Sequence, residues 1–194
     1  MPDAQDKTTP FKSSRSSCRL LVVAAVTLLA VARYFAMEYY LPNFRTVEPG
    51  KLYRSGQPRE FGLYWLEARG IRTIISLRSA NDSKSSAERS FAERHGITFI
   101  NIPVGTRGYD TETSTQEFLE IVTDSHYWPV LVHCSRGKER TGIMAAAYRM
   151  EVDGWSKLDA WNEACATGLD PMRFPSIYAV LETFGGGADK FDEY

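Results

Sequence analysis

The chain has 194 residues, of which 43% are hydrophobic and 12% aromatic, enough for one domain with a buried core plus an extension. The formal net charge is −1, so no general basic field indicates a nucleic-acid partner. The three cysteines (Cys18, Cys134 and Cys165) lack metal-ligand spacing and the three histidines do not cluster, so we expect no metal site.

The N-terminal part combines a polar segment with an apolar run. Residues 1–19 are polar and rich in Ser and Thr, which is typical of a disordered segment. Residues 20–32 are apolar, with the length of a signal-peptide core and a small-x-small cleavage pattern at Ala30-Val-Ala32. The flanking arginines and the aromatic residues that follow the run favour an uncleaved transmembrane anchor over residues 20–41. A cleaved signal and a buried helix are the alternatives.

Basic residues flank the run on both sides. Four basic residues precede the apolar run and outnumber the two acidic residues there, Asp3 and Asp6, which predicts a cytoplasmic N-terminus. The globular part of this single-pass membrane protein would then lie on the extracytoplasmic side. The asymmetry is small, because Arg33, Arg45 and Lys51 follow the run.

After a linker over residues 42–50, short β-branched runs alternate with helical patterns. We expect strands within residues 51–58, 71–77, 97–104 and 129–133. We expect helices over residues 60–69, 85–96, from 114 onward, 141–153, 156–167 and 175–184, and a loose tail over residues 185–194. Ser85 with Glu88, and Ser114 with Glu117, have the spacing of a capping box and set two of the helix starts.

Repeated β-then-α units predict an α/β fold over residues 42–184, with a central, mostly parallel sheet flanked by helices. In open sheets of this kind, ligands bind beyond the carboxyl ends of the strands. Cys134 stands at that position, directly after the strand over residues 129–133. The functional site is therefore expected around this cysteine.

Residues 129–142 read as a strand, a polar loop and a helix, and we name residues 134–140 the Cys134 loop. This geometry aims backbone N–H groups and the positive end of a helix dipole into the loop, which suits an anion. A cysteine placed there has its thiolate favoured and becomes a nucleophile at neutral pH. Arg140, at the end of the loop, offers a planar fork to two oxygens of a phosphoryl group.

The run His133-Cys-Ser-Arg-Gly-Lys-Glu-Arg-Thr-Gly142 resembles the signature of the cysteine-based protein tyrosine phosphatase superfamily, in an atypical dual-specificity-like form. A Walker phosphate loop is excluded, because Glu139 follows Gly137-Lys138 where Ser or Thr is required. The resemblance implies a dual-specificity-phosphatase-like fold and hydrolysis of phosphotyrosine, phosphoserine or phosphothreonine, without metal or organic cofactor.

The resemblance also assigns roles to residues. Cys134 would attack phosphorus and form a phosphocysteine, while Arg140 and the loop N–H groups hold the other phosphoryl oxygens. Thr141 would donate a hydrogen bond to the thiolate, and His133 either positions the loop or is an ordinary core histidine. The residues expected to bind the substrate phosphate are Ser135, Arg136, Gly137, Lys138, Glu139 and Thr141.

A carboxylic acid should protonate the leaving oxygen. In the superfamily it usually lies on a loop that here corresponds to residues 105–113, so Asp110 is the candidate and Glu112 the reserve. Glu139 is a third candidate, since myotubularin-like lipid phosphatases carry an acidic residue directly before the loop arginine.

Arg136 and Lys138 make the Cys134 loop basic. This resembles plant and fungal atypical dual-specificity phosphatases, some of which act on inositol pyrophosphates, although Ser135 stands where a lysine is usual. We therefore expect as partner a phosphorylated protein or, alternatively, an inositol phosphate or phosphoinositide. A non-catalytic phosphate-binding module and a sulfurtransferase are the competing classes.

Overall fold

The computed structural model describes residues 14–80, 83–105, 111–172 and 184. The chain divides into two compact units, Met1–Ala36 and Met37–Tyr194. Helix α1 (Ser14–Tyr40) makes up the described part of the first unit and continues into the second.

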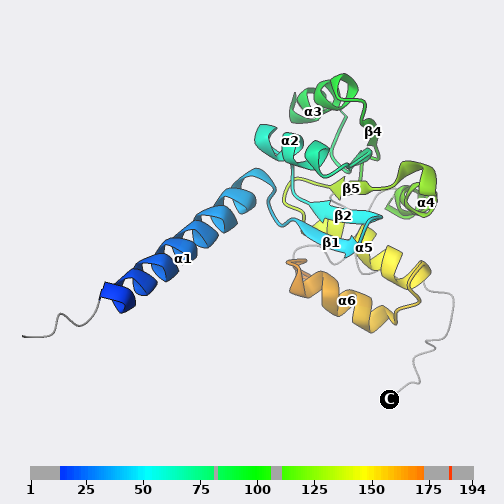
Figure 1. The fold of residues 1–194 in the computed structure, drawn as a ribbon. Coiled ribbons are helices and arrows are strands. Elements are labelled where there is room, and N and C mark those ends of the chain that lie inside the picture. Colours follow the sequence, from blue (N-terminus) through cyan, green and yellow to red (C-terminus); the bar gives the residue numbers. More distant parts are fainter. Residues whose placement is uncertain (1–13, 81–82, 106–110, 173–183, 185–194) are drawn as a thin grey trace, which may run out of the picture. The chain divides into compact units, whose positions relative to one another are not determined.

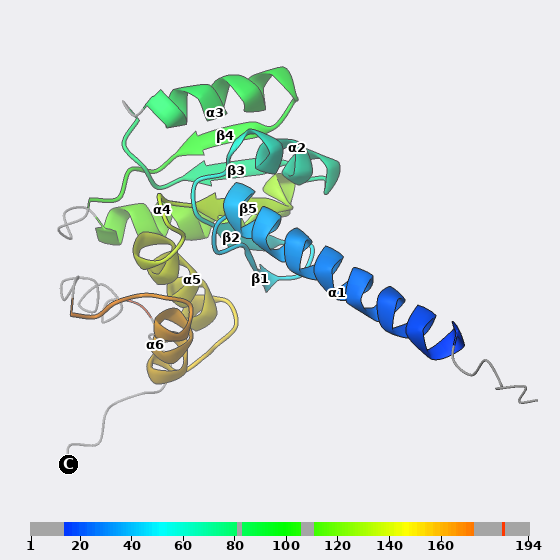
Figure 2. The same ribbon diagram turned by 90° about the vertical axis from the view of Figure 1, so that its left-hand side faces the viewer.

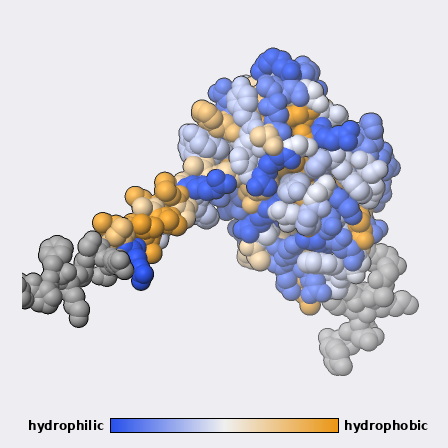
Figure 3. Space-filling view, viewed as in Figure 1, coloured by the Kyte–Doolittle hydropathy of each residue, from blue (hydrophilic) through white to orange (hydrophobic). Residues whose placement is uncertain are grey.

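Within α1, residues Cys18–Tyr40 are long and apolar enough to cross a membrane, judged by length and composition. Figure 3 shows the apolar residues along this helix. The helix begins at Ser14 rather than at Leu20, so the predicted disordered segment of residues 1–19 is helical in its last part. No Pro or Gly separates Ser14 from the apolar run, and nothing in the sequence stops the helix there. Residues 1–13 lie outside the described part of the chain.

The second unit is built on one five-stranded sheet (Figure 1). Its strands stand in the order β1 (Arg45–Glu48), β2 (Leu52–Ser55), β5 (Val130–His133), β3 (Thr73–Ser76) and β4 (Thr98–Asn101). Only β1 is antiparallel to its neighbour; the pairs β2–β5, β5–β3 and β3–β4 are parallel. The predicted α/β fold with a mostly parallel sheet is confirmed.

Helices cover both faces of the sheet (Figures 1 and 2). α2 (Glu60–Ala68) and α3 (Ser83–Arg94) lie on one face, and α4 (Thr111–Thr123) and α5 (Glu139–Glu151) on the other, with α6 (Lys157–Ala166) packed on α5. A short 3₁₀ helix, Ser125–Tyr127, precedes β5.

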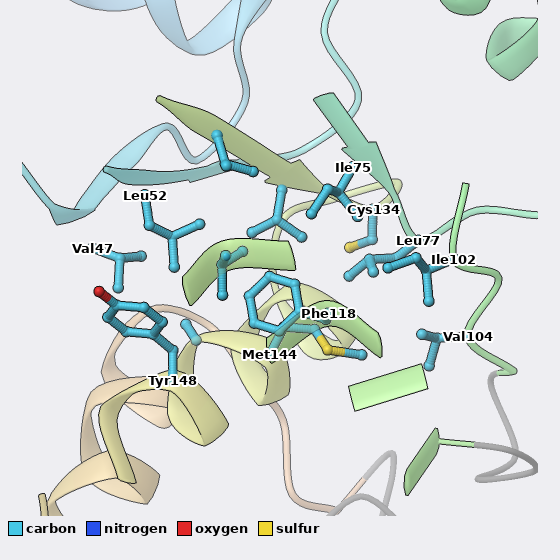
Figure 4. Packing of buried hydrophobic residues seen from close by; sticks show 14 residues of the cluster. Val47, Leu52, Ile75, Leu77, Ile102, Val104, Phe118, Cys134, Met144 and Tyr148 are labelled. Atoms are coloured by element: carbon cyan, nitrogen blue, oxygen red, sulfur yellow. The ribbon is translucent and has the colours of Figure 1, made fainter. Parts of the chain in front are cut away.

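The alternation of side chains along the strands creates two core clusters. Ile74 and Leu131 belong to the cluster that includes α2 and α3 residues, whereas Ile75 and Val132 belong to the cluster under α4 and α5. Figure 4 shows the second cluster, in which Cys134 lies at the end next to Leu77. Because β5 is buried on both faces, the loop that follows it starts from a fixed position.

The structure corrects three local predictions. Neither capping box starts a helix, because α3 begins at Ser83 and α4 at Thr111. Ser85 and Glu88 are instead buried within α3. The predicted linker over residues 42–50 contains strand β1. The predicted helix over residues 175–184 and the predicted loose tail fall outside the described residues, except for Phe184, which is buried.

Candidate active site

The Cys134 loop connects β5 to α5. The chain leaves the sheet at His133, and α5 begins at Glu139, so the intervening N–H groups belong to the loop that leads into the N-terminus of a helix. The Cys134 side chain is 2% exposed, and the Gly137 N–H donates to Cys134 Sγ over 3.2 Å. The loop therefore already directs a backbone donor at the sulfur, as a nucleophilic thiolate requires.

Opposing effects act on the pKa of the Cys134 thiol. Burial raises it, but hydrogen bonding by the Thr141 hydroxyl and N–H, the charge of Arg140 and the Arg136 N–H lower it, and together they bring the pKa below its ordinary value. The Thr141 hydroxyl is buried and forms no complete hydrogen bond within the described residues, which leaves its proton available to the sulfur. The sequence-based expectation of a favoured thiolate thus has an identifiable physical cause.

A buried charge pair lies behind the cysteine. Glu88 Oε2 is 3.0 Å from His133 Nε2, and both side chains are almost fully buried. Gln57 Nε2 donates to the same carboxylate oxygen over 2.8 Å. His133 Nε2 makes no aligned hydrogen bond within the described residues, so its contact with Glu88 is an ion pair. Burial lowers the pKa of His133, but the adjacent Glu88 carboxylate outweighs it and raises the pKa above its ordinary value. His133 Nδ1 lies 3.3 Å from the Cys134 carbonyl oxygen, which links this pair to the loop.

Arg140 is anchored to the sheet. Its Nη1 donates to the Leu77 carbonyl over 2.8 Å and reaches the Val104 carbonyl at 3.4 Å. These carbonyls follow β3 and β4, so the guanidinium is held at the carboxyl edge of the sheet. One nitrogen is used for anchoring, and the other donors are available to a bound anion.

Arg54 is a site residue that sequence reasoning missed. It lies on β2, is 2% exposed, and donates from Nη2 to the Gly137 carbonyl over 2.9 Å. Burial lowers the pKa of Arg54 to about 10, against the raising effect of the charges of Glu163 and Cys134, so it stays a cation at neutral pH. The sequence did contain a signal for this residue. Arg54 stands two positions after Leu52 and therefore shares the strand face of a buried side chain.

Gly137 is required by two features of the loop. Its φ is +69°, in the left-handed region, and a Cβ there would lie 2.4 Å from the Gly56 nitrogen and 2.5 Å from the Ser55 carbonyl carbon. The turn after β2 therefore packs directly against the Cys134 loop. The Gln57 N–H adds a hydrogen bond to the Ser135 carbonyl over 3.1 Å.

The charged side chains of the loop contact other residues of the same chain. Arg136 Nη2 forms an ion pair with Glu139, whose side chain is 9% exposed. The aliphatic stem of Lys138 lies along Gly168, where an added Cβ would be 3.0–3.1 Å from it. Glu139 is thus engaged by a cation within the loop and is not placed as a free acid.

The general-acid candidate Asp110 lies outside the described residues. The reserve, Glu112, is exposed in the first turn of α4. Within the described ranges, no three His, Cys, Asp or Glu side chains come together in a way that could hold a metal ion.

The sequence and the fold resemble known phosphatases. OCA1 of Yarrowia lipolytica, a putative tyrosine-protein phosphatase, is 35% identical over 119 residues, which are 59% of this chain and 46% of the relative. Rice inositol diphosphatase DSP1 is 28% identical over 155 residues, 71% of this chain and 64% of the relative. The chain thus spans less than two thirds of the length of these curated relatives.

Solved structures agree with this comparison. The crystal structure of Pseudomonas aeruginosa TpbA superimposes with a TM-score of 0.60 at 25% identity, covering 76% of this chain and 85% of TpbA. A family model described as "DSP-PTPase phosphatase fused to NAD+ Kinase" matches residues 38–172, which include every described residue of the Cys134 loop and its supports. The chain therefore belongs to this family of atypical dual-specificity phosphatases, within the cysteine-based protein tyrosine phosphatase superfamily.

Proposed function

We propose that the chain is a cysteine-dependent phosphatase that hydrolyses phosphomonoesters through a phosphocysteine intermediate. The observation that carries the proposal is the Cys134 thiol of lowered pKa, with the Gly137 N–H directed at its sulfur and the Arg140 guanidinium anchored at the same edge of the sheet. A non-catalytic phosphate-binding module would need only the amides and the arginine. The activation of the thiol therefore favours an enzyme.

The reaction has two balanced steps. The Cys134 thiolate forms a bond to phosphorus while the bond to the leaving oxygen breaks, and that oxygen takes a proton from the acid, which we assign to Asp110. Water then gives a proton to the Asp110 carboxylate and forms a bond to phosphorus, the P–S bond breaks, and phosphate leaves as the thiolate returns. The loop amides and Arg140 stabilise the charge on the remaining phosphoryl oxygens in both steps.

The proposed substrates are phosphotyrosine, phosphoserine and phosphothreonine in proteins. Inositol phosphates or phosphoinositides are the second candidate, supported by the rice relative that is named an inositol diphosphatase. Activity toward each class can be compared directly on one preparation.

We also propose that α1 anchors the chain in a membrane and that the domain lies on the extracytoplasmic side. The support is the apolar Cys18–Tyr40 segment and the basic residues that precede it. The full chain should resist alkaline extraction from membranes, and a reporter fused after residue 41 should report the extracytoplasmic side. Release of a soluble form that starts at Arg33 would indicate a cleaved signal instead, and a cytosolic reporter signal would reverse the orientation.

The experiment that tests the catalytic proposal uses the full chain in mild detergent and an aryl phosphate. Cys134→Ser should abolish turnover while phosphate binding persists, and Arg140→Lys should reduce turnover severely, because an ammonium cannot replace a bidentate fork. Cys165→Ser, on α6, is the matched control and should retain activity. Appreciable turnover by Cys134→Ser would refute the mechanism, and release of sulfite from thiosulfate would indicate a sulfurtransferase.

A further inference from the structure

The last turn of α1 belongs to the second compact unit, together with the sheet and its helices. Leu41, the residue after the helix, is 1% exposed and lies in one core cluster with Leu63 of α2. The Arg59 N–H, just before α2, donates to the Tyr40 carbonyl over 2.9 Å. The segment that could span a membrane, Cys18–Tyr40, therefore ends directly against α2.

The contact between α2 and the end of this segment is close. A Cβ added at Gly62 would lie 2.4 Å from the Tyr40 carbonyl oxygen and 3.0 Å from Leu41 Cγ. The Gly56 N–H donates to the Pro42 carbonyl over 2.6 Å, which extends the contact to the turn that supports the Cys134 loop. Because the segment ends here, a bilayer around it places the start of α2 at the level of the lipid headgroups.

Three aromatic side chains at this junction are exposed. Tyr39 is 58% exposed, Phe61 is 65% exposed and Tyr64 is 47% exposed, and we call these three residues the aromatic face. The Phe61 ring packs edge-to-face on the Tyr40 ring, with 5.2 Å between the ring centroids. The Arg59 guanidinium lies 3.7 Å from the centre of the Tyr39 ring. The aromatic face is therefore continuous with the end of the apolar segment.

The outer side of α2 is unusual for a helix that faces water. Leu63 is buried on the inner side, whereas Phe61, Tyr64 and Ala68 are exposed and have the spacing of one helix face. Exposed apolar side chains that gather in one place mark a contact with a partner or a membrane. Aromatic rings are enriched where a protein crosses the membrane–water interface, because their apolar bodies and polar edges suit that layer.

The charges next to the aromatic face limit how it can bind. Arg59 and Glu60 directly precede Phe61, are both exposed, and have opposite signs. Attraction to anionic lipid is therefore not the basis of the contact, and burial of the rings among the headgroups is. A zwitterionic membrane satisfies this chemistry.

We propose that the aromatic face rests in the headgroup region of the membrane that holds α1, so that the phosphatase domain lies on the bilayer. The inference rests on the proposed membrane anchor. Arg59 and Tyr64 also line a cavity whose wall includes Ser135 of the Cys134 loop. Docking of the aromatic face thus brings the approach to the nucleophile next to the lipid surface.

The test measures the depth of a fluorescent label in the full chain, reconstituted in phosphatidylcholine nanodiscs. The three cysteines are changed to serine, and a single new cysteine, Ala68→Cys, carries the label. Ala68 lies on the outer side of α2 but outside the aromatic face, so the face stays intact. We expect lipids with a nitroxide on the headgroup to quench this label, equally at low and high salt, because the contact does not depend on exposed charges.

The control label is Leu158→Cys, an equally apolar position that is 58% exposed on α6, on the opposite side of the sheet from α2. It should keep its intensity with the nitroxide lipid. Phe61→Ser with Tyr64→Ser should relieve the quenching at Ala68. Val152→Ser with Leu158→Ser, which also removes two exposed apolar side chains, should not relieve it.

An unquenched label at Ala68, in a chain that resists alkaline extraction, would overturn the docking without reference to any variant of the aromatic face. Quenching that persists in Phe61→Ser with Tyr64→Ser, or that is as strong at Leu158, would overturn it as well. Quenching that requires anionic lipid or disappears at high salt would contradict the apolar basis of the contact. Failure of the anchor itself appears separately, as release of the unlabelled chain from membranes by alkali.

Discussion

Glu88→Gln should destabilise the domain and weaken the nucleophile at the same time. The substitution keeps the size of the side chain but removes the charge that lies 3.0 Å from His133 Nε2. The expected effects follow because that charge stabilises the protonated form of the buried His133 imidazole.

The magnitude can be worked from this distance. At an effective dielectric constant of about 20, two unit charges 3.0 Å apart attract each other by about 5–6 kcal/mol. Burial of both groups offsets much of this attraction, and loss of one partner of such a pair costs about 3–5 kcal/mol. We expect a loss of that size in the free energy of unfolding at pH 6.

The loss should depend on pH in a defined direction. The pKa of His133 is raised in the folded state above its ordinary value of 6.5, so the stability that its protonation contributes is fully present below pH 6.5. This contribution fades as the pH rises through the folded-state pKa. The difference between the original chain and Glu88→Gln should therefore be largest in mild acid and shrink in alkali.

The catalytic effect follows from the contact between His133 and the loop. The positive imidazolium favours the Cys134 thiolate, so its loss should raise the pKa of the thiol and move the acid limb of the pH–rate profile to higher pH. Denaturant unfolding and aryl phosphate kinetics of the full chain in detergent, from pH 5 to 9, measure both effects. The control is Glu93→Gln, an exposed position of the same helix. A variant with a pH-independent loss and an unmoved acid limb would refute the reasoning.

Three further predictions test the loop and the acid. Gly137→Ala should lower the free energy of unfolding by about 2–5 kcal/mol and abolish turnover, because the position has a φ of +69° and the added Cβ would lie 2.4 Å from the Gly56 nitrogen. The control Gly154→Ala, at a φ of +68° with no close neighbour, should lower it much less. Thr141→Val should move the acid limb of the pH–rate profile up by about one unit, since it removes a hydrogen bond to the thiolate, and an unmoved limb would contradict this role. Asp110→Asn should cost about 10²–10⁴-fold on an alkyl phosphate and much less on an aryl phosphate, whereas Glu139→Gln should lose activity equally on both; the reverse pattern would move the acid role to Glu139.

The Cys134 loop was predictable because its chemistry is contiguous. A β-branched run, a cysteine, a glycine and an arginine follow one another, and their spacing determines strand, loop and helix. The alternation of strands and helices predicts the sheet for the same reason. Each of these signals spans only neighbouring residues.

The supports of the loop were not predictable, because they come from distant elements. Glu88 lies in a largely polar segment and fits a capping box with Ser85, so its spacing indicated a helix start. Only the packing of α3 on the sheet shows that both side chains are buried. Strand β1 was missed because its Arg45 and Thr46 are exposed and because, among the described strands, it pairs with β2 alone.

The contacts of the loop carbonyls explain how the amides become available to a phosphate. The Gly137 carbonyl accepts from Arg54, and the Ser135 carbonyl accepts from the Gln57 N–H. The Cys134 carbonyl lies against the His133 ring. In a trans peptide the N–H of the next residue points opposite to the held oxygen, so the N–H groups of Ser135, Arg136 and Lys138 turn away from these contacts. The Arg136 N–H, like the Gly137 N–H, is directed at the Cys134 sulfur. The orientation of the cradle is thus fixed before substrate binds, and no reorganisation is needed as charge develops on the phosphoryl group. By this reasoning Arg54 and Gln57 act on catalysis without touching the substrate, and loss of either should lower kcat more than it raises KM.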